Sequence, residues 1–468
     1  MTKDLTRGKP LSLIVGFAVP VLLGMLFQQF YNLVDTMIVG KILGPDALAA
    51  VGSTGSLSFM IIGFCSGVCS GFSIPMSQAF GAQDEKALKK YIGNCFWLCA
   101  GFAVVMAVAT GLLCRPILQL MKTPEDILED AYGYIVIIFW GIPVIYLYNM
   151  LSGMIRSVGD SKTPVLFLAI ASVLNIILDV VLITVIPLGV AGAAVATVIA
   201  QGVSGISCLF YIRKKFPILQ PERSQWHPDK LYAMKLCAMG IPMGLQYSVT
   251  AIGSVILQSA VNSLGTLYVA SVTAGSKLSL IFCCPFDALG ATIATYGGQN
   301  IGAGKVERIR EGVKVCMLLG SVYSVMALGL FFLAGSRLAL LFVDGENARI
   351  ITNARMFLVY NSLFYIPLTA VNVYRFVIQG IGYSQVAILA GVFEMAARAA
   401  VGLVFVPMIG FTAACVASPA AWIAADLFLI PTYLHYMKKL GGKRDVRTGG
   451  SWRQVRKRNR SGKRQTAG

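Results

Sequence analysis

The stretch SQAFGAQDEKALKKYIG (residues 77–93) returns 221 residues later as the related stretch GQNIGAGKVERIREGV (residues 298–313). Three further pairs of segments repeat at offsets that all lie between 220 and 224 residues: VPVLLG (19–24) with IPMGLQ (241–246), RSVGDSKTP (156–164) with QGIGYSQ (379–385), and PLGVAGAAVAT (187–197) with PMIGFTAACVA (407–417). Since Gly, Pro and Gln keep their places at a nearly constant offset, the sequence predicts two halves of the same design.

The composition places both halves in a membrane. Of the 468 residues, 56% are hydrophobic and only 13% are charged, whereas about a quarter of a soluble domain is charged. A bilayer core needs roughly 20 apolar residues per helix. The apolar runs therefore predict an all-α integral membrane protein with twelve spans, at residues 13–40, 47–78, 91–114, 131–153, 165–186, 191–212, 236–262, 268–297, 314–334, 356–379, 386–406 and 412–436.

The basic residues predict the orientation of these spans. With the N-terminus inside, 31 of the 39 Lys and Arg residues, Arg375 among them, fall on the cytoplasmic side and 6 on the other side. Only Lys277 and Arg398 are assigned to the spans. This bias predicts that both termini are cytoplasmic. We expect a multi-pass protein of a bacterial plasma (cytoplasmic) membrane.

The repeat also predicts the domain organisation. One period holds six helices, and because six is even both halves enter the membrane in the same sense, related by a pseudo-two-fold axis along the membrane normal. Parallel repeats of this kind suit a transporter with its site between the halves. The predicted parts are an N-lobe (1–212), a cytoplasmic linker (213–235), a C-lobe (236–437) and a tail (438–468).

The tail is strongly basic, with 12 Lys and Arg residues and a single acid, Asp445. Its composition predicts a disordered segment. Such a segment can touch the anionic headgroups of membrane lipids. We expect no nucleic-acid partner.

Acids inside the predicted spans are the candidate functional residues. A charge at the centre of a span costs roughly 2.5–3.5 kcal/mol on insertion scales, yet Asp35 lies in the first span with no basic residue nearby until Lys41. At 1.5 Å per residue, Asp35, Asp179 and Thr197 lie about 12–13 Å from the outer ends of their helices. Asn175, four residues before Asp179, shares its helix face.

The two carboxyls and the Thr197 hydroxyl at one depth, with the Asn175 amide one turn deeper, form a set of hard oxygen donors. Such a set suits Na⁺, or a proton shared between the two acids. The alternative is that the acids are protonated and form hydrogen bonds between helices, and for Asn175 and Thr197 plain packing between helices is also open. The second half lacks an equivalent set, because the repeat offset places Gly402 opposite Asp179.

Other charges lie in the second half. Glu394 and Arg398 are four residues apart and can pair on one helix face. They are interpreted either as a structural salt bridge or as a cavity-lining element. Lys277, Asp287 and Asp426 are further charged residues of these helices whose roles stay open.

Five motifs together resemble the multidrug and toxic compound extrusion (MATE) family: VDTMIVGKILGPDALAAVG (34–52), QAFGAQDEKAL (78–88), RSVGDSKTP (156–164), LNIILD (174–179) and PLGVAGAAVATVIAQ (187–201). The resemblance covers residues 10 to about 440. It implies two six-helix lobes forming a V and antiport of amphipathic, often cationic drugs against Na⁺ or H⁺, with no other cofactor.

In the prokaryotic branch of that family, the cation site of the N-lobe is formed by residues that Asp35, Asn175, Asp179 and Thr197 match. Another branch carries acids on helices 7 and 10. This sequence has Gln246 and no acid on helix 7, and none on helix 10, which argues against a cation site in the C-lobe.

The resemblance and the repeat also suggest which residues contact the exported compound, and we expect a monomer. Candidates for lining the substrate cavity are Gln28, Tyr31, Gln246, Tyr247, Glu394 and Arg398. No phosphate-binding loop, nucleophilic triad or metal cluster is present in the sequence, so an enzyme is not expected. Two rival functions stay open: a flippase for a lipid-linked precursor, which favours a strongly basic cavity, and a non-transporting scaffold or channel.

Overall fold

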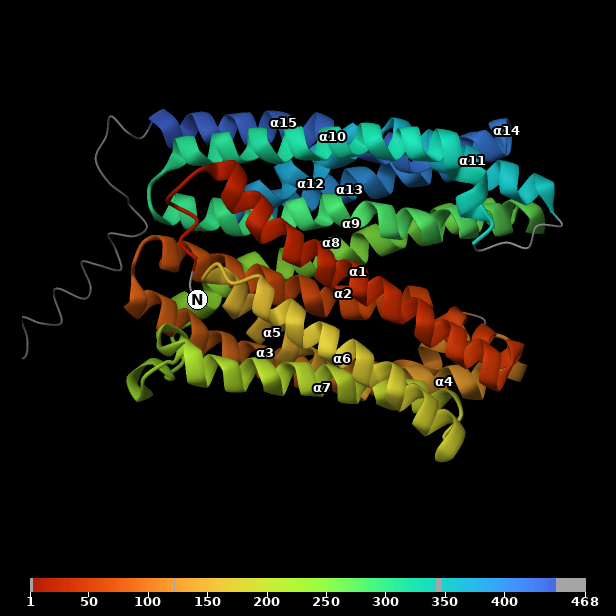
Figure 1. Cartoon of the computed structure of the whole chain (residues 1–468), viewed down its shortest axis with the longest axis horizontal. Helices are drawn as coiled ribbons and strands as arrows, with labels where there is room; N and C mark the ends of the chain where they lie inside the picture. The colour runs from red at the N-terminus through yellow and green to blue at the C-terminus, as the bar shows by residue number, and fades with distance from the viewer. Residues whose placement is uncertain (1–2, 122, 342–346, 443–468) are drawn as a thin grey trace, which may run out of the picture.

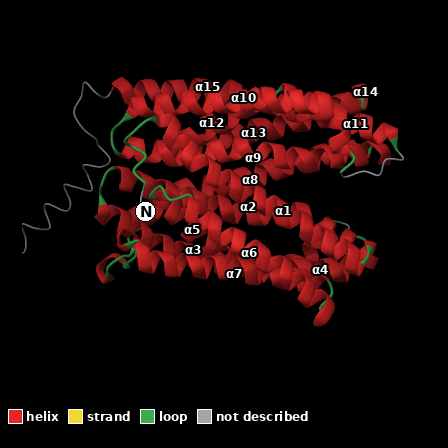
Figure 2. Ribbon diagram, viewed as in Figure 1, coloured by secondary structure: helices red, strands yellow, loops and turns green. Residues whose placement is uncertain are grey.

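The structure is a computed structural model that describes residues 3–121, 123–341 and 347–442, and these residues form helices and loops without a strand (Figures 1 and 2). We call the helices of the first half the N-lobe. They are α1 (Pro10–Leu43), α2 (Pro45–Gly81), α3 (Glu85–Leu120), α4 (Glu125–Trp140), α5 (Ile142–Ser157), α6 (Lys162–Val180), the π-helical turn η1 (Val181–Val185) and α7 (Val190–Lys215).

The second half, which we call the C-lobe, repeats this series. Two short 3-10 turns, η2 (Pro217–Leu219) and η3 (Arg223–Gln225), precede it. Its elements are α8 (Lys230–Asn262), α9 (Thr266–Gly302), α10 (Val306–Ala339), α11 (Ala348–Leu363), α12 (Tyr365–Gly380), α13 (Ser384–Ala400), the π-helical turn η4 (Val401–Phe405), α14 (Val406–Ile409) and α15 (Phe411–Gly442). Figure 1 shows the two lobes as two stacked groups of long helices.

The number of candidate spans agrees with the twelve predicted. In the described residues, ten helices are long and apolar enough to cross a membrane, and two bent helix pairs bring the total to twelve. The first pair, α4 and α5, bends by 46° and the second, α11 and α12, by 52°. Pro143 lies at the start of α5, where a proline is tolerated because its missing N–H has no partner in a first turn. The sequence analysis predicted one span at each place, 131–153 and 356–379, without a bend.

Helix α1 belongs to both lobes. Its first turns place Leu13, Ile14 and Phe17 in the hydrophobic core of the C-lobe, together with Phe286 on α9. Its later turns pack against α6 of the N-lobe. Figure 1 shows α1 crossing obliquely from one lobe to the other. A single helix therefore connects the C-lobe core with the N-lobe residue Asp35.

Glycines let the lobes touch along α2 and α8. A Cβ on Gly71 would lie 2.5 Å from the Cα of Gly240, and one on Gly67 would lie 2.6 Å from the carbonyl oxygen of Met243. Real Cβ atoms essentially never make contacts this short. The backbones of α2 and α8 therefore meet directly in the centre of the molecule.

The lobe boundaries differ from the predicted ones by a few residues. Helix α7 continues to Lys215 and α8 begins at Lys230, so the linker between helices covers residues 216–229 rather than 213–235. Helix α15 continues to Gly442, so residues 438–442 belong to the helix and not to the tail. The predicted disorder of residues 443–468 lies outside the described residues.

The linker is fixed to the N-lobe. The backbone N–H of Asp229 donates to Oδ1 of Asn94 on α3 at 2.8 Å, and the Asp229 carboxylate pairs with Lys90 at 3.2 Å. A Cβ on Gly93 would lie 2.3 Å from the carbonyl oxygen of Gln225. The start of α8 is therefore anchored on α3.

We call the end of the molecule where α1 begins and α15 ends the terminal end, and the opposite end the distal end. Arg308 and Arg310 on α10 tie both chain segments to this end: Arg308 donates to the carbonyl of Gly8 at 3.0 Å, and Arg310 donates to that of Met437 at 3.2 Å. At the distal end, Gly44 directly precedes α2 and Gly265 directly precedes α9, with φ of 92° and 102°, a conformation that glycine adopts without strain.

Candidate functional site

The two acids predicted to meet do so between α1 and α6. Asp35 lies on the buried side of α1 with 7% of its surface exposed, and Asp179, in the last turn of α6, is fully buried. Each carboxyl group is an electrostatic neighbour of the other. In the described part of the chain, no donor reaches Oδ1 of Asp35 or either carboxyl oxygen of Asp179. The structure thus brings together two acids that share no basic partner.

Asn175 and Thr197 form a second contact in the same region. The Asn175 amide Nδ2 lies 3.5 Å from Oγ1 of Thr197 and donates to it, which connects α6 with α7. The amide oxygen of Asn175 is buried without a hydrogen-bond partner among the described residues. The depth estimate had placed Thr197 level with the two acids and Asn175 one turn deeper, whereas Thr197 pairs with Asn175, one turn along α6 from Asp179.

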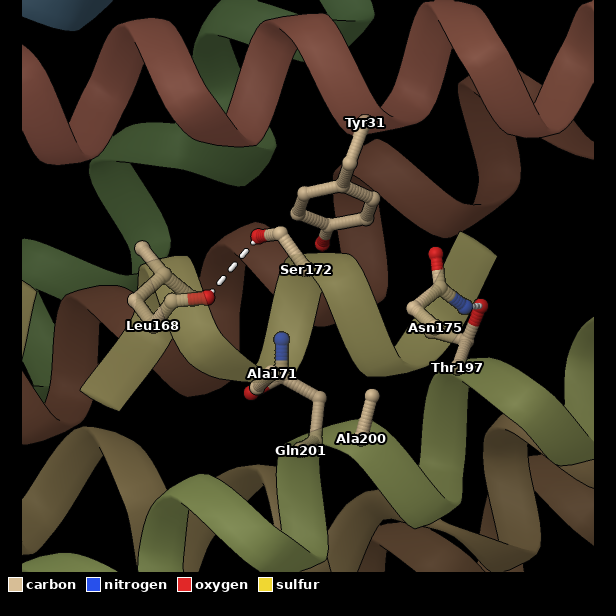
Figure 3. A pocket seen from close by; sticks show the side chains of 8 residues that line it. All are labelled: Tyr31, Leu168, Ala171, Ser172, Asn175, Thr197, Ala200 and Gln201. Carbon is tan, nitrogen blue, oxygen red and sulfur yellow. Dashed lines mark hydrogen bonds between the residues drawn. The ribbon is translucent and has the colours of Figure 1, made fainter. Parts of the chain in front are cut away.

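A small cavity lies beside these residues, with a volume of about 10 Å³. A cavity of roughly 10–15 Å³ holds a single water molecule, so this space suits one small ion or water. Figure 3 shows Tyr31 of α1 pointing into it opposite Asn175. The lining residues are Tyr31, Leu168, Ala171, Ser172, Asn175, Thr197, Ala200 and Gln201.

Tyr31 joins the cavity to the acid pair. It lies one helical turn before Asp35, contacts the side chain of Gln201 and is an electrostatic neighbour of both Asp35 and Asp179. The sequence assigned Tyr31 to the substrate cavity between the lobes. The structure buries it inside the N-lobe instead, where its hydroxyl faces the proposed ion site.

The chemistry of this donor set favours a hard cation or a proton. Buried polar oxygens without partners are costly, because they lose water and gain nothing in return. Carboxylate, amide and hydroxyl oxygens suit hard cations. No group of three or more His, Cys, Asp or Glu side chains that could hold a metal occurs in residues 3–121, 123–341 and 347–442. The candidate site therefore combines carboxyl, amide and hydroxyl oxygens, with the two acids at its centre.

Three other predicted cavity residues, Gln28, Gln246 and Tyr247, differ in their surroundings. Gln28 on α1 is exposed, and Tyr247 on α8 is half-buried. Tyr247 lies against α2, since its Cβ is 3.2 Å from the position of a Cβ on Gly63. Gln246 is buried within the C-lobe and accepts a hydrogen bond of 2.7 Å from Gln379. Tyr247, but not Gln246, therefore lies at the contact between the lobes.

Glu394 and Arg398 form the predicted salt bridge in the C-lobe, at 3.5 Å between Nη1 and Oε2. Glu394 also pairs with Arg375 on α12. All three side chains are buried. Arg375 was counted on the cytoplasmic side, but the structure places it inside a span. Its position within the predicted span 356–379 already indicated this.

This network of Arg375, Glu394 and Arg398 can be compared with the strongly basic cavity that a flippase would favour. Arg375 adds a third basic residue to Lys277 and Arg398 in the spans, but both arginines share the carboxylate of Glu394. Lys277 is exposed. Asp426 is buried, and its Oδ1 has no partner in the described part of the chain. Acids and bases are therefore mixed here, and the spans of the C-lobe do not form a uniformly basic surface.

Comparisons with known proteins agree with this architecture. A family model described as MatE matches residues 20–181 and 242–405. A Bacillus subtilis protein named "Probable multidrug resistance protein YpnP" is 32% identical over 380 residues, which cover 81% of this chain and 83% of that protein. Another from the same organism, "Probable multidrug resistance protein YoeA", is 30% identical and covers 71% of this chain and 73% of its own length.

Solved structures share the fold. One described as "Outward-facing conformation of a multidrug resistance MATE family transporter of the MOP superfamily" has a TM-score of 0.88 at 21% identity, and covers 94% of this chain and 99% of that chain. At this identity the likeness concerns the fold, including the twelve-span, two-lobe arrangement.

Proposed function

The chain belongs to the MATE family of multidrug efflux transporters, and we propose that it is a secondary active antiporter. It exports amphipathic, often cationic compounds in exchange for Na⁺ or H⁺. The substrate class rests on the names of its relatives, which are called probable multidrug resistance proteins. The coupling rests on the chain's own residues.

The contact between Asp35 and Asp179 carries the proposal. Two buried acids side by side, without a basic partner in the described residues, are stable when a cation or a proton lies between them and are costly when it leaves. An ion that binds and leaves in each cycle makes this pair useful. Asn175, Thr197 and Tyr31 supply further oxygens beside it.

Alternating access follows from the two lobes. The cation enters from the distal end, neutralises Asp35 and Asp179 and favours release of the exported compound on that side. The lobes then rock about their contact along α2 and α8, and the ion leaves at the terminal end. Helix α1 lies in both lobes, so a change at Asp35 reaches the C-lobe through one continuous helix.

We assign the terminal end to the cytoplasm. The excess of Lys and Arg in the segments on that side supports this orientation, and anionic lipid headgroups are natural partners of the basic tail. We propose a monomer, because each chain contains both lobes and the proposed ion site lies wholly within one of them.

The test is transport by purified protein in sealed vesicles loaded with a cationic dye. A Na⁺ gradient alone and a pH gradient alone are imposed in separate experiments. We expect gradient-driven dye movement with at least one of them, and the active gradient identifies the ion. Dye movement that is absent under both gradients would reject the antiporter proposal.

A further inference from the structure

Two glutamines tie the lobes together at the terminal end in a reciprocal way. Gln78, in the last turn of α2, donates from Nε2 to the carbonyl of Gly380 at the end of α12, at 2.9 Å. Gln299, in the last turn of α9, donates from Nε2 to the carbonyl of Ser157 at the end of α5, also at 2.9 Å. The donors are 221 residues apart and the acceptors 223. Each lobe therefore donates an equivalent glutamine hydrogen bond to a backbone carbonyl of the other lobe.

The helices that carry these glutamines touch through their backbones. A Cβ on Gly81 would lie 1.9 Å from the carbonyl oxygen of Gln299, and a Cβ on Gly302 would lie 2.0 Å from that of Gln78. Ser77, beside Gln78, is buried, and its Cβ lies 3.0 Å from the Cβ position of Gly298. The lobes are thus closed tightly at this end.

The segment Lys3–Lys9 adds a feature that the repeat does not duplicate. The backbone N–H of Lys3 donates to the carbonyl of Val158 in the N-lobe at 3.1 Å. Two residues later, the N–H of Leu5 donates to Oε1 of Gln299 in the C-lobe at 2.9 Å. Gln299 therefore holds the other lobe with its amide nitrogen and the N-terminal segment with its amide oxygen.

Further bonds fix the segment on the C-lobe. Lys305 donates to the carbonyl of Thr6 at 2.7 Å, and Asn300 donates to that of Leu5 at 3.3 Å. The Leu5 side chain is buried in the C-lobe core. Figure 1 shows the described part of this segment passing from beside the N-lobe to the start of α1 on the C-lobe. The segment thus spans the junction of the lobes.

We propose that Gln78, Gln299 and the segment Lys3–Lys9 form a latch that keeps the terminal end closed and must open for that end to be exposed. The inference rests on the proposed alternation between two open states. It assigns to the segment that precedes α1 a part in setting how often the terminal end opens.

The test measures opening without any transported compound or ion gradient. Ser77→Cys places a thiol in the closed contact, where a bulky maleimide in solution reacts only when the lobes separate. Because the partly buried native thiols Cys237 and Cys283 can also react, labelling is measured by mass spectrometry on the peptide that contains position 77. The rate of labelling at that position is proportional to the open fraction. The native thiols Cys95 and Cys316 lie in the cores of the two lobes, and their lack of reaction shows that each variant stays folded.

Gln299→Leu, introduced into the Ser77→Cys protein, removes both bonds of the amide. Each hydrogen bond corresponds to a factor of roughly two to ten in the equilibrium, so we expect labelling of the introduced thiol to rise roughly four- to hundredfold. Lys305→Met, which loosens the segment without touching the contact between the lobes, is expected to raise it severalfold. It also provides the test should Gln299→Leu fail to fold.

Arg7→Ala is the matched control in the same segment. The Arg7 side chain is 74% exposed and pairs with Asp4, so this variant is expected to label at the rate of Ser77→Cys alone. Unchanged labelling in both Gln299→Leu and Lys305→Met would overturn the latch, as would an equal rise in Arg7→Ala. A latch that fails this test leaves dye transport, and thus the proposed antiport, unaffected.

Discussion

Asp35 on α1 and Asp179 on α6 are electrostatic neighbours in the interior of the N-lobe, and both side chains are buried. The two residues are 144 positions apart in the chain. Only the packing of α1 against α6 brings them together. A structural pair would be expected to include a basic side chain, and this one has none in the described residues.

Replacing either acid should stop coupled transport. Asp35→Asn and Asp179→Asn keep the shape of the side chain but remove the charge that an incoming ion neutralises. We expect gradient-driven dye efflux from vesicles to fall at least about tenfold, which corresponds to about 1.4 kcal/mol. Asp46→Asn, on an exposed side chain at the distal end, is the control and should transport normally. Full activity in Asp35→Asn would remove the acid pair from the coupling site.

Thr197 and Asn175 should tune the ion affinity rather than abolish coupling. Thr197→Val removes one oxygen and the partner of the Asn175 amide but leaves both acids in place. We expect the ion concentration for half-maximal transport to rise about three- to tenfold, with little change in the maximal rate, as measured by varying Na⁺ or pH in the vesicle assay. Ser172 lines the same cavity, but its hydroxyl donates to the carbonyl of Leu168 in its own helix. Ser172→Ala is therefore the control and should leave the ion affinity unchanged.

Glu394 should be essential for stability. Glu394→Gln leaves Arg375 and Arg398 buried without a counter-charge, and breaking a buried ion pair from one side costs about 3–5 kcal/mol. We expect a clear fall in the Tm of the purified protein in detergent. Glu307→Gln removes an exposed partner of Arg310 and should cost at most about 1 kcal/mol. Equal Tm values for the two variants would show that the C-lobe network contributes no stability.

The repeat and the apolar periods were enough to predict the helical architecture and the number of spans. The bends at Gly141 and Phe364 were missed, because a count of apolar residues does not register a change of helix direction. Proline gave a signal in α5, where Pro143 follows Gly141. The π-helical turn η1 after Asp179 was also missed, since one extra residue in a turn leaves no mark in a hydrophobic pattern.

Depth along each helix placed Asp35 and Asp179 at one level, and the two acids are neighbours. It also placed Thr197 at the level of the acids and Asn175 one turn deeper, whereas Thr197 pairs with Asn175. Depth carries no information about rotation around the helix axis. Tyr31 shows the consequence. It was assigned to the space between the lobes, yet it faces the N-lobe interior, because it lies one turn from Asp35 on the same face of α1. Arg375 shows a different limit: counting charges by side ignored that its apolar neighbours make it part of a span.

The close approach of α2 and α8 predicts opposite changes in Tm when Gly71 and Gly101 are each replaced by alanine. Gly71→Ala would place a Cβ 2.5 Å from the backbone of Gly240, and since backbone atoms cannot rotate away, the helices must separate. Overpacking of this kind costs about 1–3 kcal/mol, so Gly71→Ala should lower the Tm in detergent.

Gly101, in the middle of α3, is exposed and has no atom within 4 Å of its Cβ position. Gly101→Ala therefore meets no obstacle and gains helix propensity of up to about 1 kcal/mol, so its Tm should stay equal or rise. Both variants replace glycine by alanine within a helix. A difference between their Tm values therefore measures the effect of close packing at Gly71, separately from the effect of helix propensity. If Gly71→Ala were as stable as Gly101→Ala, direct backbone contact between α2 and α8 would be excluded. A loss confined to Gly71→Ala, joined by faster maleimide labelling when it is combined with Ser77→Cys, would show that this contact and the closed terminal end depend on each other.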